Sequence, residues 1–157
     1  MHERGPLADT YSPHPMLESI FSIASTLVLP AWLALAIAPT HRWTQRIAAW
    51  VVPALLAVAY VGLLVISLRQ PDAAGGFGSL EDVATLFESR HALLGGWIHY
   101  LAFDLIIGAW EARDADRIGL PRWVLIPCLG LTFMAGPAGW LLYGIARMIR
   151  LRKNRDV

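Results

Sequence analysis

Long uncharged stretches alternate with short charged clusters along this chain. Residues 19–40, 47–68 and 123–146 hold 22, 22 and 24 consecutive residues without Asp, Glu, Lys, Arg or His. At about 1.5 Å of rise per residue, each stretch makes a helix of about 33 Å or more, which is long enough to cross the hydrocarbon core of a bilayer. The pattern therefore predicts a membrane-spanning helix over each of these ranges.

A further apolar stretch, from Ala92 to Trp110, is also long enough to cross but contains His99 and Asp104. Upstream, Ser79 followed three positions later by Asp82 is close to a capping box and predicts that a helix begins at Leu80. Its first turns separate apolar from charged positions, as an interfacial segment leading into a membrane does. The sequence thus predicts another membrane helix over residues 80–111.

Together these ranges predict an all-α fold, an integral membrane four-helix bundle over residues 17–150. Residues 1–16 are expected to be a disordered polar tail, and residues 151–157 a basic C-terminal tail. Proline inside a helix removes a backbone donor and frees the carbonyl four residues earlier. Kinked helices are therefore expected at the four prolines of the uncharged stretches, and the freed carbonyls of Thr26 and Phe133 should mark the deepest kinks. The prolines are Pro30, Pro53, Pro127 and Pro137.

Composition and charge agree with a membrane protein. Of 157 residues, 56% are hydrophobic and only 16% charged, against about a quarter charged in an average soluble domain. The formal net charge of +1 and the absence of a basic block outside the C-terminal tail exclude a nucleic-acid-binding surface. With four crossings, eight Lys and Arg fall on the side of the two termini and five on the other. This excess favours cytoplasmic termini.

The polar residues of the third predicted span are the candidate site. An Asp at the centre of a span costs about 2.5–3.5 kcal/mol, so Asp104 should be neutral, paired or facing a polar cavity. Glu88 and His99 fall about 20° apart on one helix face, while Asp104 and Glu111 share the other. An interhelical hydrogen bond is the competing interpretation for Asp104, and a position at the headgroup level is the competing interpretation for Glu88 and Glu111.

Metal and cofactor chemistry has little support in the sequence. The chain has five His and one Cys, and His91 and His99 lie about 12 Å apart along one helix. No phosphate-binding loop, HExxH or GxSxG motif occurs. We therefore expect no metal site and no cofactor.

Several segments resemble the small four-span membrane-protein family of neoxanthin synthesis, the abscisic-acid-deficient type. The most distinctive are HYLAFDL and LTFMAGPAG, within the longer matching segments FSIASTLVLPAWLALAIAPTHRWT (21–44), FGSLEDVATLF (77–87), GGWIHYLAFDLIIGAWEARDA (95–115) and PCLGLTFMAGPAGWLLYGIAR (127–147). The resemblance implies a protein of carotenoid metabolism, in which an epoxide of violaxanthin opens to the allene of neoxanthin without net redox change. The polar N-terminal segment is not rich in Arg and Ser as a plastid transit segment is, which favours a bacterial-type member in a bacterial inner membrane.

That isomerisation requires a base and an acid, and the third predicted span offers both. Asp104, kept neutral by desolvation, suits the acid, and His99 suits the base, although about 140° on one helix separates them and argues against a simple dyad. Glu88, about 16 Å from His99 along the helix, would act at another point of a long substrate. The residues expected to contact the ligand are Trp97, Tyr100, Phe103, Phe133 and Pro137.

A second function remains open at this point. The chain would then be a non-catalytic pigment-binding or accessory subunit of a membrane complex, such as a photosynthetic one. Both functions predict a carotenoid or other apolar polyene as ligand and the lipid bilayer as environment. A membrane-protein partner or a second copy of the chain is compatible with either.

Overall fold

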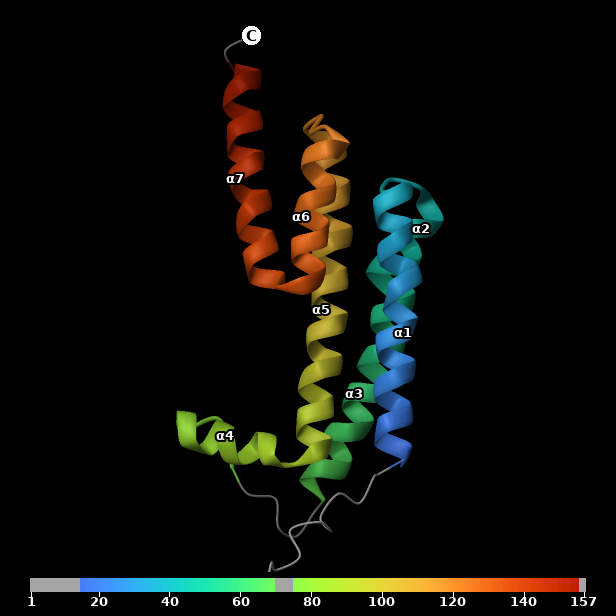
Figure 1. Ribbon diagram of the computed structural model, residues 1–157, viewed down its shortest axis with the longest axis vertical. Helices are drawn as coiled ribbons and strands as arrows, with labels where there is room; N and C mark the ends of the chain where they lie inside the picture. The colour runs from blue at the N-terminus through green and yellow to red at the C-terminus, as the bar shows by residue number, and fades with distance from the viewer. Residues whose placement is uncertain (1–14, 70–74, 156–157) are drawn as a thin grey trace, which may run out of the picture.

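The computed structural model describes residues 15–69 and 75–155, and the regular secondary structure in these ranges is helical (Figure 1). This confirms the predicted all-α class. Helix α1 spans Pro15–Ile37, and α2 (Arg42–Arg46), η1 (Ile47–Val51) and α3 (Val52–Leu68) follow one another without a break. Together with α5 (Arg90–Arg117), α1 and the segment Arg42–Leu68 are long and apolar enough to cross a membrane. The chain is a membrane protein by these criteria.

Helix α5 is the central element, and α1, α3, α6 and α7 all contact it. Apart from Glu111 and Asp114, its core positions are small or aliphatic, and Leu105, Ala109 and Ala112 are completely buried. At Gly108, an added Cβ would lie 2.5 Å from the Trp32 ring of α1. Small residues on a membrane helix let neighbouring helices approach closely, which is why several elements can pack around α5.

The segment before α5 forms a separate helix, α4 (Leu80–Glu88), which extends sideways from the start of α5 in Figure 1. The predicted start at Leu80 is confirmed, and Ser79 Oγ accepts a hydrogen bond from the Asp82 backbone N–H at 3.1 Å. One continuous helix over 80–111 is not observed, because Ser89 adopts an extended conformation with ψ of 121°. The turn at Ser89 gives α4 the crosswise position of an interfacial helix.

The fourth predicted span is a helical hairpin and not one crossing helix. Helix α6 (Arg122–Met134) runs back along α5, and α7 (Gly136–Arg155) reverses direction and packs beside α6 (Figure 1). Ala135, at φ −155° and ψ 73°, lies outside the helical region, and Pro137 in the first turn of α7 has no N–H with which to continue α6. The predicted four-helix bundle is therefore not confirmed: three long helices and a hairpin replace it.

The structure does not confirm proline-kinked helices either. Helices α1 and α6 continue through Pro30 and Pro127 as single elements. Pro53 follows the π-helical turn η1, which contains Ala49, the residue whose carbonyl Pro53 frees. A widened turn is a known way to accommodate a proline ring in a helix.

The predicted tails lie mostly at the edges of the described ranges. Of the tail 1–16, Pro15 and Met16 already belong to α1, and residues 1–14 lie outside the described residues. Of the tail 151–157, residues 151–155 are the last turn of α7.

The turn between α5 and α6 uses Gly119 at φ +66°, a conformation that glycine adopts without strain.

Candidate functional site

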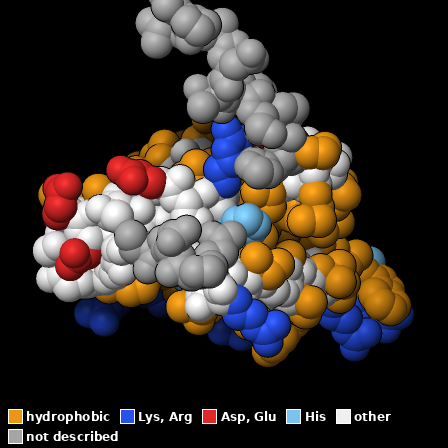
Figure 2. All heavy atoms as spheres, turned by 90° about the horizontal axis from the view of Figure 1, so that it is seen from below, with side chains coloured by type: hydrophobic (Ala, Val, Ile, Leu, Met, Phe, Trp, Pro, Cys, Tyr) orange, Lys and Arg blue, Asp and Glu red, His pale blue; other side chains and the backbone are white. Residues whose placement is uncertain are grey.

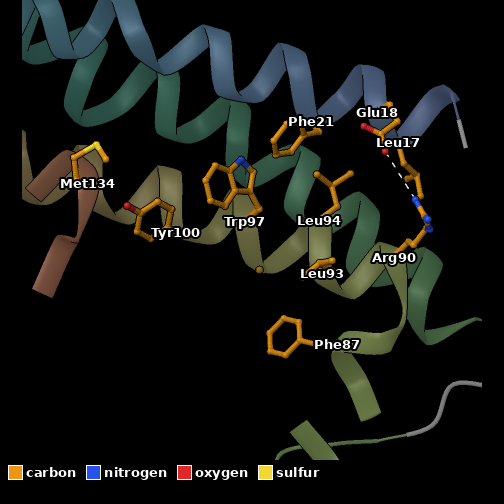
Figure 3. A pocket seen from close by; sticks show the side chains of 11 residues that line it. Leu17, Glu18, Phe21, Phe87, Arg90, Leu93, Leu94, Trp97, Tyr100 and Met134 are labelled. Atoms are coloured by element: carbon orange, nitrogen blue, oxygen red, sulfur yellow. Dashed lines mark ion pairs between the residues drawn. The ribbon is translucent and has the colours of Figure 1, made fainter. Parts of the chain in front are cut away.

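An apolar groove of about 840 Å³ runs along α5 (Figure 3). Helix α1 forms one wall, Phe87 of α4 and α5 itself form the others, and Met134 at the end of α6 closes it. The lining residues are Leu17, Glu18, Phe21, Phe87, Arg90, Leu93, Leu94, Gly96, Trp97, Tyr100 and Met134. Cavities of this size and mainly apolar lining are typical of small-molecule sites.

The two ends of the groove differ in polarity. At its mouth, Arg90 pairs with Glu18 at 3.8 Å, and both side chains are partly exposed. At its deep end lie Tyr100 and Met134, and the ten residues from Arg90 to Tyr100 correspond to about 15 Å along the helix. The groove therefore leads from a charged mouth to a mainly apolar base with one hydroxyl group.

Two contacts fix the walls of the groove. Trp97 Nε1 donates a hydrogen bond to Ser25 Oγ at 3.0 Å, which ties α5 to α1. The Phe87 ring lies so close to the backbone at Gly96 that an added Cβ would be 2.7 Å from it. Trp97 also lies 5.7 Å from Phe21 and 5.4 Å from Tyr100 between ring centroids. Aromatic rings thus line the groove along its length.

A smaller cavity of about 310 Å³ lies next to the groove and shares Trp97, Tyr100 and Met134 with it. Phe133 lines this second cavity. The Tyr100 hydroxyl donates to the Phe133 carbonyl at 3.0 Å. The Phe133 carbonyl precedes Pro137 by four residues and is the acceptor that the sequence predicts this proline to free. Tyr100 supplies the hydrogen bond that satisfies it.

Asp104 lies one turn beyond Tyr100, against the tip of the hairpin. A Cβ added at Gly136 would overlap the Asp104 carboxylate, so only glycine fits at this contact. Asp104 Oδ2 is buried and has no hydrogen-bond partner among the described residues. An unpaired buried polar atom is costly, more so near the middle of a membrane helix. Asp104 is therefore the one described side chain with an unmet buried acceptor.

Glu111, seven residues after Asp104, lies on the same face of α5 and also contacts the hairpin. It is completely buried, and Thr132 Oγ1 of α6 lies 3.0 and 3.1 Å from its two carboxylate oxygens. Glu111 therefore does not extend its carboxylate to the surface of the protein, as snorkelling to the headgroup level would require. A Cβ added at Gly139 of α7 would overlap Thr132, so the hairpin can close over Thr132 only with glycine at that position.

The remaining predicted site residues lie elsewhere. His99 is exposed and stacks on Phe103 at 4.5 Å between ring centroids, with Tyr60 of α3 at 5.7 Å. Glu88 is exposed at the last residue of α4 and does not line the groove. Pro137 is exposed beside Gly136 at the hairpin tip. The structure thus groups Trp97, Tyr100 and Phe133, and it places His99 and Asp104 against different neighbours.

The sequence predicted close backbone approach at GPAG (136–139), which the Gly139 contact with Thr132 fits, but it did not single out Thr132, the α6 residue that contacts Glu111. The available signal was the spacing of Asp104 and Glu111, which put two carboxylates on one face and required a polar partner. Within residues 15–69 and 75–155, no group of three His, Cys, Asp or Glu is placed to hold a metal ion. The chemistry that the described groups offer is proton transfer by a buried carboxyl group in an apolar setting.

Comparisons with known proteins place the chain in a family. It is 34% identical over 109 residues to Protein ABA DEFICIENT 4, chloroplastic, of Arabidopsis thaliana, and the matched part covers 65% of this chain and 48% of the relative. The chain thus spans about half the length of this curated relative. No solved structure matches it. The family model described as ABA DEFICIENT 4-like matches residues 19–143, and the chain belongs to that family, as its sequence motifs predicted.

Proposed function

We propose that this protein acts in carotenoid or isoprenoid metabolism as a cofactor-free isomerase that opens a carotenoid epoxide by general acid–base catalysis. Membership of the ABA DEFICIENT 4-like family supports the area of metabolism. The observation that carries the chemistry is the buried, unpartnered Oδ2 of Asp104, one helical turn beyond Tyr100 at the deep end of the groove. A carboxyl group kept at such a cost is better explained by use than by packing.

The groove suits one end of a polyene. Its walls are apolar and aromatic, and its volume of about 840 Å³ holds a ring and the adjoining part of a chain. Because the groove is open along its side, the rest of a long polyene lies among the lipid chains. In this arrangement the ring enters first, which brings the epoxide toward Tyr100 and Asp104.

The reaction balances without a redox partner. A proton leaves the polyene carbon next to the epoxide, a carbon–carbon double bond forms, the carbon–oxygen bond breaks, and the oxygen takes up a proton to become a hydroxyl group. One neutral carboxyl group can donate from one oxygen while its other oxygen accepts, and it ends in its starting state. Asp104 can therefore serve both roles, which removes the need for a dyad with His99.

Conversion assays on purified variants test the proposal. The protein in detergent or nanodiscs is incubated with violaxanthin, and products are separated by chromatography. Asp104→Asn keeps the size of the side chain but removes the acid, so we expect the rate to fall by about 10²–10⁴-fold. Glu81→Gln, at an exposed position of α4, is the matched control and should convert at the unmodified rate.

Further variants separate the alternatives. If His99 is the base, as the sequence predicts, His99→Phe loses conversion as completely as Asp104→Asn does. If Asp104 serves both roles, His99→Phe and Glu88→Gln retain conversion. Full conversion by Asp104→Asn contradicts the assignment. If the native protein retains a coloured polyene but never changes it, the protein is a pigment-binding subunit and not an isomerase.

A further inference from the structure

The hairpin places the C-terminal end of the chain beside the C-terminal end of α5. Arg147 of α7 pairs with Asp114 at 2.6 Å, and Arg150 Nε donates to the Ile118 carbonyl at 3.2 Å. At the tip, Gly136 meets Asp104. Helix α7 therefore runs parallel to α5 and away from the groove mouth. In Figure 1, the start of α1 and the end of α7 lie at opposite ends of the molecule.

This arrangement makes the charge distribution strongly one-sided. Ten Lys and Arg lie at the end of the molecule where α5 meets α6, called here the basic end: Arg42, Arg46, Arg113, Arg117, Arg122, Arg147, Arg150, Arg152, Lys153 and Arg155. Only Arg69 and Arg90 of the described residues lie at the opposite end, called here the groove end. Four carboxylates accompany them: Glu18, Glu81, Asp82 and Glu88. Figure 2, which views the groove end, shows acidic side chains gathered at one side of this face.

Neither arm of the hairpin is long enough to cross a membrane. Helix α6 has 13 residues, which gives about 20 Å, and α7 has 11 residues before its first charge at Arg147, which gives about 17 Å. The hydrocarbon core is about 30 Å thick. From Arg117 to Asp104 is also about 20 Å along α5, so the tip of the hairpin reaches the middle of the core. The non-helical backbone at Ala135 can lie at that depth because its polar groups are satisfied within the hairpin: its N–H donates to the Leu131 carbonyl at 2.7 Å, and its carbonyl accepts from the Ala138 N–H at 2.9 Å.

We propose that the chain crosses the membrane three times, that the α6–α7 hairpin enters and leaves from the basic end, and that the basic end faces the cytoplasm. Among the described residues, ten cations against two is a large bias in the sense of the positive-inside rule. The sequence predicted both termini in the cytoplasm because it treated residues 123–146 as one crossing helix. One crossing helix would place Arg147 and the last turn of α7 at the groove end, whereas the hairpin keeps them at the basic end.

The orientation has a consequence for the groove. Its mouth, at Glu18 and Arg90, then lies in the leaflet away from the cytoplasm, at the depth of the headgroups. The ligand enters sideways from that leaflet, past the Glu18–Arg90 ion pair, and its leading end lies against Trp97 and Tyr100. This inference does not depend on the proposed reaction, because it concerns only the side from which the groove is reached.

Single-cysteine labelling in a bacterial host tests the arrangement. In a Cys128→Ala background, which removes the buried native thiol, three variants report three positions: Glu18→Cys at the groove mouth, Asp116→Cys at the end of α5 and Asn154→Cys at the end of α7. Each replaces an exposed residue. Intact cells are treated with a membrane-impermeant maleimide before and after permeabilisation.

We expect Glu18→Cys to be labelled in intact cells, and Asp116→Cys and Asn154→Cys only after permeabilisation. If Asn154→Cys follows Glu18→Cys and not Asp116→Cys, the chain crosses four times and the re-entrant hairpin is wrong. If the two basic-end positions are labelled in intact cells and Glu18→Cys is not, the orientation is inverted. If Glu18→Cys reacts under neither condition, Glu81→Cys on exposed α4 reports the side of the groove end.

Discussion

Asp104 and Glu111 both carry a carboxyl group, but the two groups differ in their hydrogen bonds. Both project from one face of α5 toward the hairpin, seven residues apart. Glu111 is completely buried and has the Thr132 hydroxyl against both oxygens, whereas Asp104 has a buried oxygen with no partner among the described residues. One carboxyl group is part of the packing, and the other is held in a costly position beside a groove.

The difference shows how structural and functional polar groups in a membrane can be distinguished. A buried carboxyl group with a donor stabilises the contact that supplies the donor, because removing either partner leaves a buried polar atom unsatisfied. A carboxyl oxygen without a donor adds no hydrogen bond to the fold, so replacing it should cost less stability than removing the donor of a satisfied carboxyl group. Stability and activity are therefore expected to separate between these two sites.

The largest effect on stability should come from the glycine that lets the hairpin close over Thr132. Gly139→Ala places a Cβ against the Thr132 backbone, which cannot move aside as a side chain can. We expect a loss of about 3 kcal/mol in the free energy of unfolding, measured by denaturant titration in detergent. Gly144→Ala, on the same helix with nothing within 4 Å of the new Cβ, is the control and should be neutral or stabilising. Equal losses in both variants would refute the close packing.

A second effect contrasts the two carboxyl groups directly. Thr132→Val keeps the volume of the side chain but removes the donor to Glu111, so we expect a loss of about 2 kcal/mol. Asp104→Asn should cost clearly less than Thr132→Val in the same titration, although it removes catalysis under the proposed function. A destabilisation by Asp104→Asn as large as that by Thr132→Val would show that Asp104 is a structural residue.

A third effect extends the comparison to Asp114, which lies near the basic end. The Tyr143 hydroxyl donates to Asp114 Oδ2 at 2.8 Å, and Arg147 Nε contacts the same oxygen. Tyr143→Phe removes one of these donors and leaves the other, so we expect a loss of about 1 kcal/mol. Conversion should remain at the unmodified rate, because Tyr143 lines neither the groove nor the cavity beside it. A change in activity without a change in stability would contradict this assignment.

Much of this architecture was predictable because it depends on local pattern. Runs without charge predicted the long helices, and the Ser79–Asp82 spacing predicted the start of α4. The family was predictable from its motifs, which lie within the matched residues 19–143. Trp97 and Tyr100 were predicted to contact the ligand, and the structure places both in the groove, although their contact with a ligand stays a prediction.

The hairpin was not predictable in the same way. The uncharged run 123–146 has the length of a crossing helix, and its composition does not distinguish one helix from two half-length ones. What decides between them is tertiary: Gly136 fits against Asp104 and Gly139 against Thr132, and these contacts exist only if the chain reverses. The same contacts bury Glu111, so its position could not be derived from α5 alone.

The smallest effect should come from the ion pair at the groove mouth. Glu18 and Arg90 lie 3.8 Å apart with side chains 53% and 42% exposed, and solvent screens such pairs strongly. Glu18→Gln should therefore change the free energy of unfolding by less than about 0.5 kcal/mol, in contrast to the loss expected for Thr132→Val in the buried pair at the other end of α5. If the pair instead positions the polar group of a ligand, the same variant weakens binding of a hydroxylated polyene more than that of a hydrocarbon polyene of equal length. Titration of both polyenes into the two proteins, followed by quenching of Trp fluorescence, measures that difference, and equal weakening for both ligands would show that the mouth does not recognise polarity.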